Sequence, residues 1–412
     1  MARVVVTGMG AVAPNGNGVQ TFIENSLAGK VGIKPISKFD ATETGITVAG
    51  EIDDFDPKEV VGKKAAKRMD LYSQYAIQSA VEAMEMAGVI EENTRPEDLG
   101  VIYGSGIGGL TTIQEQIIKM HDKGPKRVSP MFVPMAIANM AAGNLSIRFN
   151  AQNISTAIVT ACASATNSIG EAYRQIKAGH AKVMITGGSE ASVNEIGIAG
   201  FAALTALSPS TDPQKASRPF DAERNGFVLG EGGATLVLED LEHAQTRGAQ
   251  ILGEVVGYGA TSDAFHITSP DPEGKGAARA MQAAIDEAGI KPTQISYINA
   301  HGTATHANDE GEAKAINQVF GPDNEVRVSS TKGMTGHLLG AAGAIEAVLT
   351  IAALQQGKLP ANIGCFEQDP ACQLNLVQLG AQDAPNIEYA ISNSFGFGGH
   401  NAVLAFKKWS AD

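Results

Sequence analysis

Short runs of apolar residues alternate along the whole chain with longer, helix-like stretches. Strands are predicted at residues 4–7, 101–103, 154–159 and 183–186, and helices at residues 66–87 and 167–177. The second helix is followed by Ala178-Gly179, a common way to end a helix. Strands that are apolar throughout, between helices, favour an α/β fold with a buried sheet.

A second set of elements begins near residue 251 and repeats the first in kind. Residues 254–260 (EVVGYGA) resemble residues 4–11 (VVVTGMGA), because both are strands that run into paired glycines. No Pro- or Ser-rich linker separates the two sets. We therefore predict two related halves, residues 1–250 and 251–412, which pack as one body.

The glycines after the first strand invite a different interpretation. Gly8, Gly10 and Ala13 fit the GxGxxA fingerprint of dinucleotide-binding folds. Pro14, however, lies where the phosphate-binding helix would continue, and proline removes a hydrogen bond there. We therefore reject a nucleotide cofactor at this position.

Composition narrows the class of protein. The 412 residues are 43% apolar and 18% charged, enough for a large core, and the net charge of −13 argues against nucleic-acid binding. The first strand begins at once, which predicts no secretory leader. The apolar stretch at residues 338–354 contains Glu346, so we expect a buried helix too short and too charged to span a bilayer. Three cysteines without CxxC spacing indicate neither zinc nor disulfides, and favour the cytoplasm.

The chemistry centres on Cys162, in the run TACAS (residues 160–164) between a predicted strand and a predicted helix. Its small neighbours leave room for a bulky thioester. Helix N–H groups directed at the thiol would lower its pKa from about 8.5 and enrich the thiolate. A lone cysteine is usually a small core residue, but this position predicts a nucleophile.

Two histidines have surroundings that suit the same site. His301 opens HGTAT after an apolar strand, and His337 closes TGH before a run of small residues. Either histidine alone would be interpreted as structural. Together with Cys162 they predict two hydrogen-bond donors for an oxyanion or enolate, in an enzyme that forms an acyl-thioester on cysteine.

These motifs resemble one family from Arg3 to about Trp409. The matching residues are Cys162 in TACAS, His301 in HGTAT, Lys332 and His337 in SSTKGMTGH, and the run NSFGFGG at residues 393–399. Together they resemble the elongating β-ketoacyl-acyl-carrier-protein (ACP) synthases, particularly the synthase II type of bacterial fatty acid synthesis. The resemblance implies a thiolase fold, with two pseudo-symmetric halves in five α-β-α-β-α layers, and a homodimer.

The resemblance also implies a two-stage acyltransferase reaction. Cys162 would attack an acyl-ACP thioester, with the oxyanion held by the backbone N–H groups of Cys162 and Phe397. His301 and His337 would then donate hydrogen bonds to the enolate left when malonyl-ACP loses CO2, and the chain would grow by two carbons. No metal or cofactor is implied beyond the phosphopantetheine arm of the ACP substrate.

Further positions match the family by alignment of motifs. Lys332, Glu346 and Asp263 would support the site, whereas Asp309 and Glu312 are expected to be structural. The substrate would contact Ile107, Phe201, Thr268, Thr303, Thr305 and Phe397, the last acting as a gate beside a second loop at residues 263–270. ACP would dock on Lys63, Lys64, Lys67, Arg68, Lys126 and Arg127. Lys64, Lys67 and Arg68 would lie on one helical face, and the alternative is that this face is only exposed to solvent and binds no partner.

Three alternative functions stay open, and three positions differ from the family's usual residues. The chain is also compatible with a ketosynthase of a polyketide or specialised lipid pathway, a non-catalytic partner of a heterodimeric ketosynthase, or a thioesterase. Cys162 argues against the second, and no feature favours admitting water for the third. His306 and His400 stand where many members have Pro and Thr, and Thr205 stands where some relatives have a docking arginine.

Overall fold

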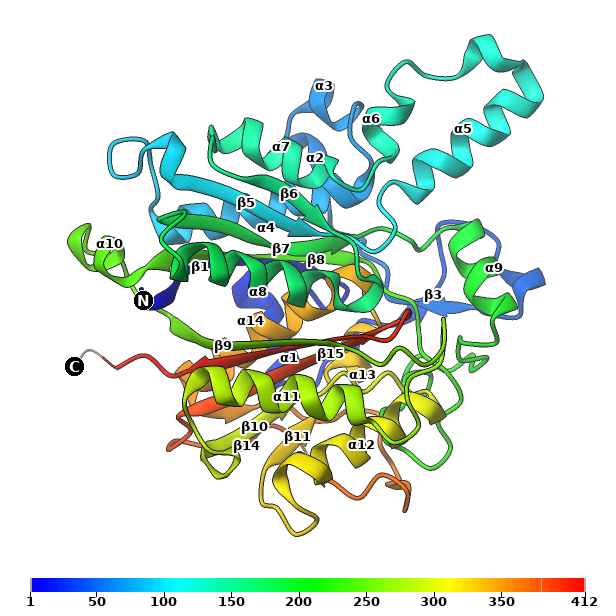
Figure 1. The fold of residues 1–412 in the computed structure, drawn as a ribbon. Coiled ribbons are helices and arrows are strands. Elements are labelled where there is room, and N and C mark those ends of the chain that lie inside the picture. Colours follow the sequence, from blue (N-terminus) through cyan, green and yellow to red (C-terminus); the bar gives the residue numbers. More distant parts are fainter. Residues whose placement is uncertain (1, 379, 411–412) are drawn as a thin grey trace.

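A 12-stranded sheet assembly runs through the computed structural model, which describes residues 2–378 and 380–410 (Figure 1). Its strands are β1 (Val4–Ala13), β2 (Gly16–Asn17), β5 (Leu99–Gly104), β6 (Ser155–Ile158), β7 (Val183–Glu190), β8 (Gly232–Asp240), β9 (Gly253–Ser262), β10 (Ile295–Asn299), β11 (Arg327–Ser329), β13 (Asn375–Leu376), β15 (Tyr389–Gly396) and β16 (His400–Lys407). Two short pairs lie apart, β3 (Lys34–Pro35) with β4 (Val48–Ala49) and β12 (Lys358–Leu359) with β14 (Gln382–Asp383).

The sheet assembly is a duplicated unit. Read from its centre outward, the first half runs β1-β8-β7-β5-β6 and the second runs β9-β16-β15-β10-β11. Numbered within its own half, each runs first, fifth, fourth, second, third. The halves join where Val4, Val5 and Val6 of β1 pair with β9. The predicted pseudo-symmetry is confirmed in the strand order.

Helices form the remaining layers. They are α1 (Val19–Leu27), α2 (Pro57–Val60), α3 (Lys63–Ala66), α4 (Leu71–Ala87), α5 (Leu110–Lys123), α6 (Phe132–Ala136), α7 (Met140–Phe149), α8 (Ser164–Lys177), α9 (Glu195–Ala203), α10 (Leu241–Thr246), α11 (Lys275–Ala288), α12 (His306–Phe320), α13 (Lys332–Thr335) and α14 (Ala342–Gln356). The strands of each half form one sheet layer. In Figure 1, α8 and α14 lie between the two layers, α4 and α7 cover the first-half layer, and α11 and α12 cover the second-half layer. The predicted five-layer α-β-α-β-α fold is confirmed.

The paired glycines are explained by helix packing. A Cβ added at Gly8 or Gly10 would lie 2.0 or 1.9 Å from a carbonyl oxygen of α4. A Cβ added at Gly257 or Gly259 would lie 2.0 Å from a carbonyl oxygen of α11. Both pairs therefore let an outer helix rest directly on its strand. β1 also continues as a strand to Ala13, so no phosphate-binding helix follows the first pair.

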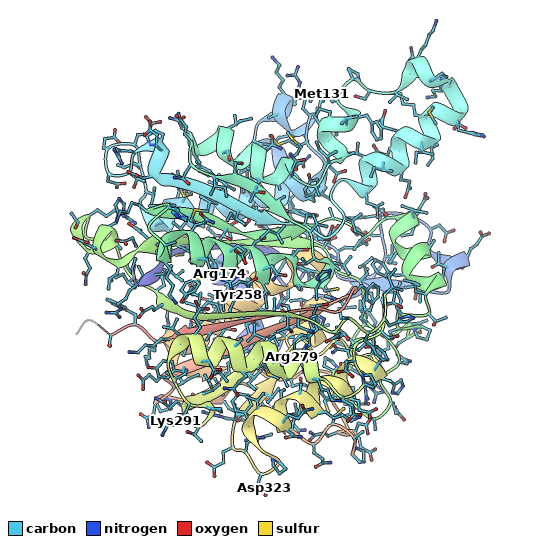
Figure 2. All side chains as sticks on the ribbon, viewed as in Figure 1. Met131, Arg174, Tyr258, Arg279, Lys291 and Asp323 are labelled. Carbon is cyan, nitrogen blue, oxygen red and sulfur yellow. The ribbon has the colours of Figure 1, made fainter. Side chains whose placement is uncertain are left out.

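The two halves share the middle of the core. One apolar cluster combines residues of β1, α8 and β8 with residues of β9, α14 and β16. Figure 2 shows Arg174 of α8 beside Tyr258 of β9, and the guanidinium lies 4.5 Å from the ring centroid. A Cβ at Gly170 would lie 2.3 Å from that same ring. Because α8 packs on both halves, the division at residue 250 stays a prediction, although residue 250 does lie between α10 and β9.

Two expectations about helices are wrong in their bounds. The helix predicted at residues 66–87 begins at Leu71, because the Asp70 side chain accepts the Tyr72 N–H and caps it. Residues 338–354 were expected to be too short and too charged to span a bilayer, and this is wrong. By length and composition alone, the segment Leu339–Gln356 could cross a membrane. Since 89% of that window is buried inside the protein, it occupies the position of a core helix.

Candidate active site

Cys162 lies on a tight turn between β6 and α8. The turn is a 3-10 helix, Ala161–Ala163, and Ala161 has a φ of +50°, a conformation that alanine rarely adopts. The Ser164 hydroxyl holds the turn closed, since it accepts the Thr160 N–H at 2.9 Å and donates to the Ala161 carbonyl at 2.7 Å. The turn places the thiol in front of the N-terminus of α8, as the sequence predicts.

His301 follows β10 on a loop held by two buried carboxylates. Glu312 accepts the N–H groups of His301 and Gly302 at 2.8 and 2.7 Å. Asp309 accepts the N–H of Thr303 at 3.0 Å and that of Ala304 at 3.2 Å. Both carboxylates come from α12 and fix the backbone that carries His301. A structural role was expected for both carboxylates, but no sequence signal predicted these partners.

His337 is held from the other side. Its N–H donates to the Val228 carbonyl at 2.7 Å, and its own carbonyl accepts the Gly230 N–H at 2.9 Å. The ring packs edge-on against Phe227, with centroids 5.2 Å apart. A short stretch of extended chain before β8 therefore positions this histidine.

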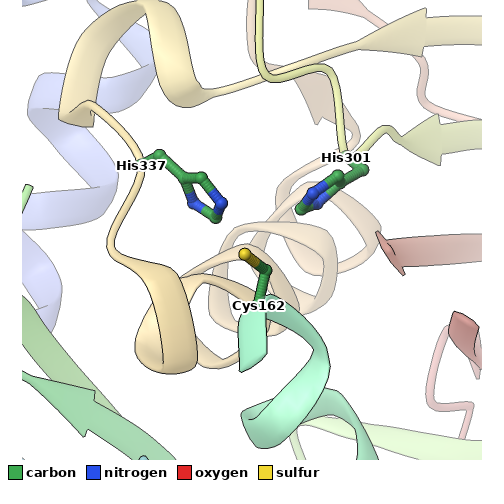
Figure 3. Close-up of side chains that lie close together, drawn as sticks. All are labelled: Cys162, His301 and His337. Carbon is green, nitrogen blue, oxygen red and sulfur yellow. The ribbon is translucent and has the colours of Figure 1, made fainter. Parts of the chain in front are cut away.

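The three side chains converge. Figure 3 shows both imidazole rings directed toward the sulfur of Cys162. The Sγ atom and one nitrogen of each ring all lie within 4.8 Å of one another, and the ring centroids are 5.3 Å apart. Three residues from three separate segments thus face one reacting atom.

Both histidines are neutral near physiological pH. Burial, reinforced by the nearby charge of Lys332, holds the pKa of His301 and of His337 well below 6.5. Lys332 Nζ lies 3.4 Å from His301 Nδ1, and the Leu339 N–H donates to His337 Nδ1 at 3.3 Å. Because Nδ1 faces a donor in each ring, the single ring proton belongs on Nε2. Each histidine can then donate a hydrogen bond into the site.

The thiol differs from expectation. Burial raises the pKa of Cys162 to about 12, although the Lys332 charge and the N–H groups of Phe397 and Cys162 act to lower it. The predicted enrichment of thiolate is therefore wrong for the substrate-free site, because removing water outweighs the helix N-terminus. The same two N–H groups lie beside Sγ, close to where the carbonyl oxygen of a thioester attacked by Sγ would become an oxyanion.

A buried ion pair lies behind His301. Lys332 pairs with Glu346 of α14 and donates to the His301 carbonyl at 2.5 Å. Burial raises the pKa of Glu346, and Lys332 opposes that shift. Glu346 therefore holds Lys332 and not His337, the other partner considered from the sequence.

The site opens into a cavity of about 280 Å³. Its lining includes the predicted residues Cys162, Phe201, Asp263, Thr268, His301, Thr303, Thr305, His337 and Phe397. It also includes residues that the sequence analysis did not assign: Leu204, Phe227, Leu339 and Phe395, and Thr205, one of the positions that differ from the family's usual residues. Among the described residues Ile107 does not line this cavity, and its side chain is 37% exposed. For a single apolar residue such as Phe227, the sequence gives no signal that distinguishes a cavity-lining position from a position in the hydrophobic core.

The two predicted gate loops are bonded to each other. Gly398 donates its N–H to the Ile267 carbonyl at 2.8 Å, and Asp263 donates its N–H to the Gly399 carbonyl at 2.9 Å. The Asp263 carboxylate accepts from Asn401 at 2.7 Å. Gly398 and Gly399 have φ values of +83° and +73°, which favour glycine. Movement of these loops stays a prediction.

The predicted docking residues are all exposed: Lys63, Lys64, Lys67, Arg68, Lys126 and Arg127. The expected single helical face does not form, because α3 is only Lys63–Ala66. Instead Lys63, Lys64 and Arg68 border a surface hollow of about 550 Å³ that includes the apolar residues Met69, Met131, Pro134 and Met140. Figure 2 shows Met131 at the end of the molecule that carries α3 and α6.

The other two residues that differ from the family pattern, His306 and His400, each begin a secondary-structure element. His306 begins α12, and its carbonyl accepts from the buried Arg224 at 3.3 Å. His400 begins β16 and is exposed. Neither of them lines the cavity among the described residues.

Comparisons with known proteins agree with this site. Residues 1–244 match "Beta-ketoacyl synthase, N-terminal domain" and residues 252–366 match "Beta-ketoacyl synthase, C-terminal domain". The chain is 51% identical over 411 residues to "3-oxoacyl-[acyl-carrier-protein] synthase 2" of Staphylococcus aureus (strain COL), covering 99% of both. A solved β-ketoacyl synthase from Burkholderia phymatum STM815 has a TM-score of 0.92 and 35% identity, covering 100% of both chains. A polyketide ketosynthase solved with its acyl-carrier protein, titled AntDE:AntF, has a TM-score of 0.92 and 31% identity over 99% of this chain and 100% of that chain. The chain belongs to the β-ketoacyl synthase family.

Proposed function

We propose that the protein is an elongating β-ketoacyl-ACP synthase of the synthase II type, which joins an acyl chain held on Cys162 to malonyl-ACP. One observation carries the proposal: a thiol and two neutral histidines, each able to donate from Nε2, face one another within 4.8 Å in a single cavity. The full-length similarity to named 3-oxoacyl-ACP synthases gives the substrate class.

In the first stage Cys162 attacks the acyl-ACP thioester. The new C–S bond forms as the bond to the phosphopantetheine sulfur breaks, and the thiol proton ends on that leaving sulfur. Because burial raises the pKa of Cys162, we expect this proton to leave during the exchange and not before it. The N–H groups of Cys162 and Phe397 are placed to stabilise the tetrahedral oxyanion, a contribution of about 3 kcal/mol per donor.

In the second stage malonyl-ACP loses CO2. The electrons of the broken C–C bond move into the thioester, and the developing enolate oxygen receives hydrogen bonds from His301 and His337. The α-carbon then attacks the acyl-Cys162 carbonyl, which releases the thiolate and forms β-ketoacyl-ACP. Lys332 adds a fixed positive charge behind His301, and Glu346 keeps that charge in place. Thr303 and Thr305, whose hydroxyls lie 3.0 Å apart on the cavity wall, suit the amide-rich pantetheine arm.

For the carrier protein we propose the basic hollow beside α3. The enzyme carries a net charge of −13, so an acidic carrier needs a local cationic surface. Lys63, Lys64 and Arg68 supply charge around an apolar floor. Charge reversal at Lys64 and Arg68 is expected to raise KM for acyl-ACP, most strongly at low salt; an unaltered salt dependence would exclude this surface.

We further propose a homodimer that pairs through β6. This strand is the outer edge of the first sheet, with Ser155 and Thr156 exposed. Two large apolar residues beside it are exposed: Val159, which directly follows the strand, and Ile147 of α7, the helix that packs on β6. An open strand edge flanked by apolar residues is typical of an interface. We also propose that the enzyme acts in the cytoplasm and needs no cofactor of its own.

The alternatives are weaker. Polyketide ketosynthases share the fold, but the 31% identity to one contrasts with 51% to a 3-oxoacyl-ACP synthase 2. A non-catalytic subunit would not need Cys162 together with both histidines.

Mass spectrometry after mixing the protein with acyl-ACP and then malonyl-ACP tests the proposal. We expect an acyl adduct on Cys162 and a carrier-bound product two carbons longer, both absent in Cys162→Ala. An adduct without elongation would indicate a transferase, and no adduct would favour the non-catalytic alternative.

A further inference from the structure

Glu190 is a buried carboxylate that the proposed mechanism does not use. It is the last residue of β7 and is fully buried. Its oxygens accept the N–H groups of Gly106 at 2.7 Å, Gly340 at 3.1 Å and Ile107 at 3.3 Å. Two hydroxyls complete the set, Ser105 at 3.4 Å and Ser192 at 3.3 Å. Among the described residues these N–H and O–H groups, and no cation, are its partners.

The Gly340 turn is the second-half copy of the Cys162 turn. Leu339–Ala341 is a 3-10 turn that leads into α14, as Ala161–Ala163 leads into α8. Leu339 has a φ of +47° and Ala161 a φ of +50°. Gly340 therefore occupies the position of Cys162 in the duplicated unit, and its N–H corresponds to the Cys162 N–H.

The residue facing each turn differs between the halves. Glu190 ends β7 and Gly396 ends β15, the two eight-residue strands at the same place in their sheets. A Cβ at Gly396 would lie only 3.1 Å from the Cys162 nitrogen, so glycine leaves that N–H open. At the Gly340 turn the side chain of Glu190, which comes from the first half, occupies the corresponding place and accepts the Gly340 N–H. One copy of the pocket is open and the other is filled by the protein's own carboxylate.

The filled copy lies next to a residue of the active site. Gly340 follows Leu339, whose N–H donates to His337 Nδ1. Glu190 fastens Gly340 against the loop at residues 105–107, and the backbones are so close that a Cβ at Gly340 would lie 2.1 Å from the Gly106 nitrogen. Movement of this turn would remove the donor from Nδ1 and release the ring.

We propose that Glu190 is a positioning residue that acts on His337 through the Leu339–Ala341 turn. Its carboxylate holds the turn so that the Leu339 N–H stays on Nδ1 and the imidazole proton stays on Nε2, directed at the substrate. The inference rests on the proposed function, because it assigns Glu190 to the malonyl half-reaction and not to acyl transfer.

The test separates the two half-reactions in Glu190→Ala. We expect the rate of malonyl-ACP decarboxylation to fall about tenfold or more, because a displaced His337 donates poorly. We expect acyl transfer to Cys162, followed by mass spectrometry, not to fall. Glu190 bonds to the Gly340 turn and not to the Cys162 turn, and its charge raises the pKa of Cys162, so its removal does not disfavour the thiolate. Equal losses in both half-reactions would overturn the proposal in favour of general loosening.

Glu82→Ala is the matched control. Glu82 of α4 is a partly buried carboxylate that, like Glu190, has no cation among its described partners, and it accepts the Ala11 and Val19 N–H groups at 3.0 and 2.7 Å. Since it lies away from the cavity, we expect both half-reactions to stay within about twofold of wild type. A decarboxylation loss as large as that of Glu190→Ala would overturn the proposal.

A spectroscopic measurement covers the case in which Glu190→Ala does not fold. The imidazoles are labelled with ¹⁵N and the His337 signals are recorded. In Glu190→Gln we expect the single ring proton to exchange between Nδ1 and Nε2, whereas in wild type it stays on Nε2. An unchanged signal would overturn the proposal. Because this readout needs no substrate, it stands even if wild type neither acylates nor decarboxylates, a result that would refute the proposed function instead.

Discussion

The two halves of the molecule share a sheet and diverge at the end of the third strand. In the first half only two residues separate β6, which ends at Ile158, from the turn that begins at Ala161. In the second half nine residues separate β11, which ends at Ser329, from the turn that begins at Leu339. The extra residues contain Lys332 and His337. Duplication thus supplied two equal frames, and the nucleophile and the electrostatic groups were divided between them.

The difference teaches that a backbone frame and its chemistry are separable. Both turns present an N–H at the start of a helix, where an anion is stabilised. The first turn carries a thiol and faces Gly396, so a substrate oxygen can enter. The second carries Gly340 and faces Glu190, so the frame is used for rigidity. The predictions below change one feature of one half toward its counterpart.

The largest effect is expected from Cys162→Gly, which makes the first turn resemble the second. Acyl transfer should fall by at least about a thousandfold, because the nucleophile is gone. Decarboxylation of malonyl-ACP should persist, since both histidines remain. Product analysis of each half-reaction checks this, and loss of decarboxylation as well would mean that the halves do not act separately.

Gly396→Ala moves the open pocket toward the filled one. The added Cβ would lie 2.7 Å from the Thr160 carbonyl and 3.1 Å from the Cys162 nitrogen. We expect acyl transfer to fall about a hundredfold, the usual cost of losing one oxyanion donor. Gly200→Ala is a suitable control, because no atom lies within 4 Å of a Cβ there. Equal rates for the two variants would show that the pocket tolerates a side chain.

Lys332→Met removes the charge that the longer second-half connection supplies. Lys332 lowers the pKa of Cys162, so its loss raises that pKa further and reduces the thiolate fraction at fixed pH. The rate of Cys162 alkylation by iodoacetamide should fall about tenfold at pH 8, where rate follows thiolate. Lys332→Met with Glu346→Gln removes the unpaired carboxylate and should alkylate faster than the single variant. No change in either would exclude the electrostatic role.

The last prediction concerns the pH dependence of stability and not a rate. Burial raises the pKa of Glu190 from 4.5 to about 7, so the folded protein binds more protons than the unfolded chain between these values. The free energy of unfolding therefore falls as pH rises from about 4.5 to about 7, and this contribution is lost above the folded pKa. In Glu190→Gln the fall should be smaller by about 1–3 kcal/mol. Urea unfolding at pH 5 and pH 7.5 measures it, and parallel curves would contradict the assignment.

Much of the site was predictable because its chemistry is written in local motifs. Cys162, His301 and His337 each stand in a short run with small or glycine neighbours, and the first two closely follow a strand. The fold class followed from buried strands between helices. Helix bounds were less accurate, since a single side chain, Asp70, moved one start by five residues from residue 66 to Leu71.

The sequence by itself pointed to Cys162, His301 and His337 as the residues that we propose carry the reaction, because a nucleophile and its donors need particular side chains at particular turns. The tertiary structure alone decided their protonation. Burial keeps the two histidines neutral and raises the pKa of Cys162, and neither burial nor the Leu339–His337 hydrogen bond can be seen in a one-dimensional pattern. The same holds for Glu190, whose partners lie 84 and 150 positions away in the chain. Electrostatics depends on distance and solvent exclusion, which exist only once the halves have packed.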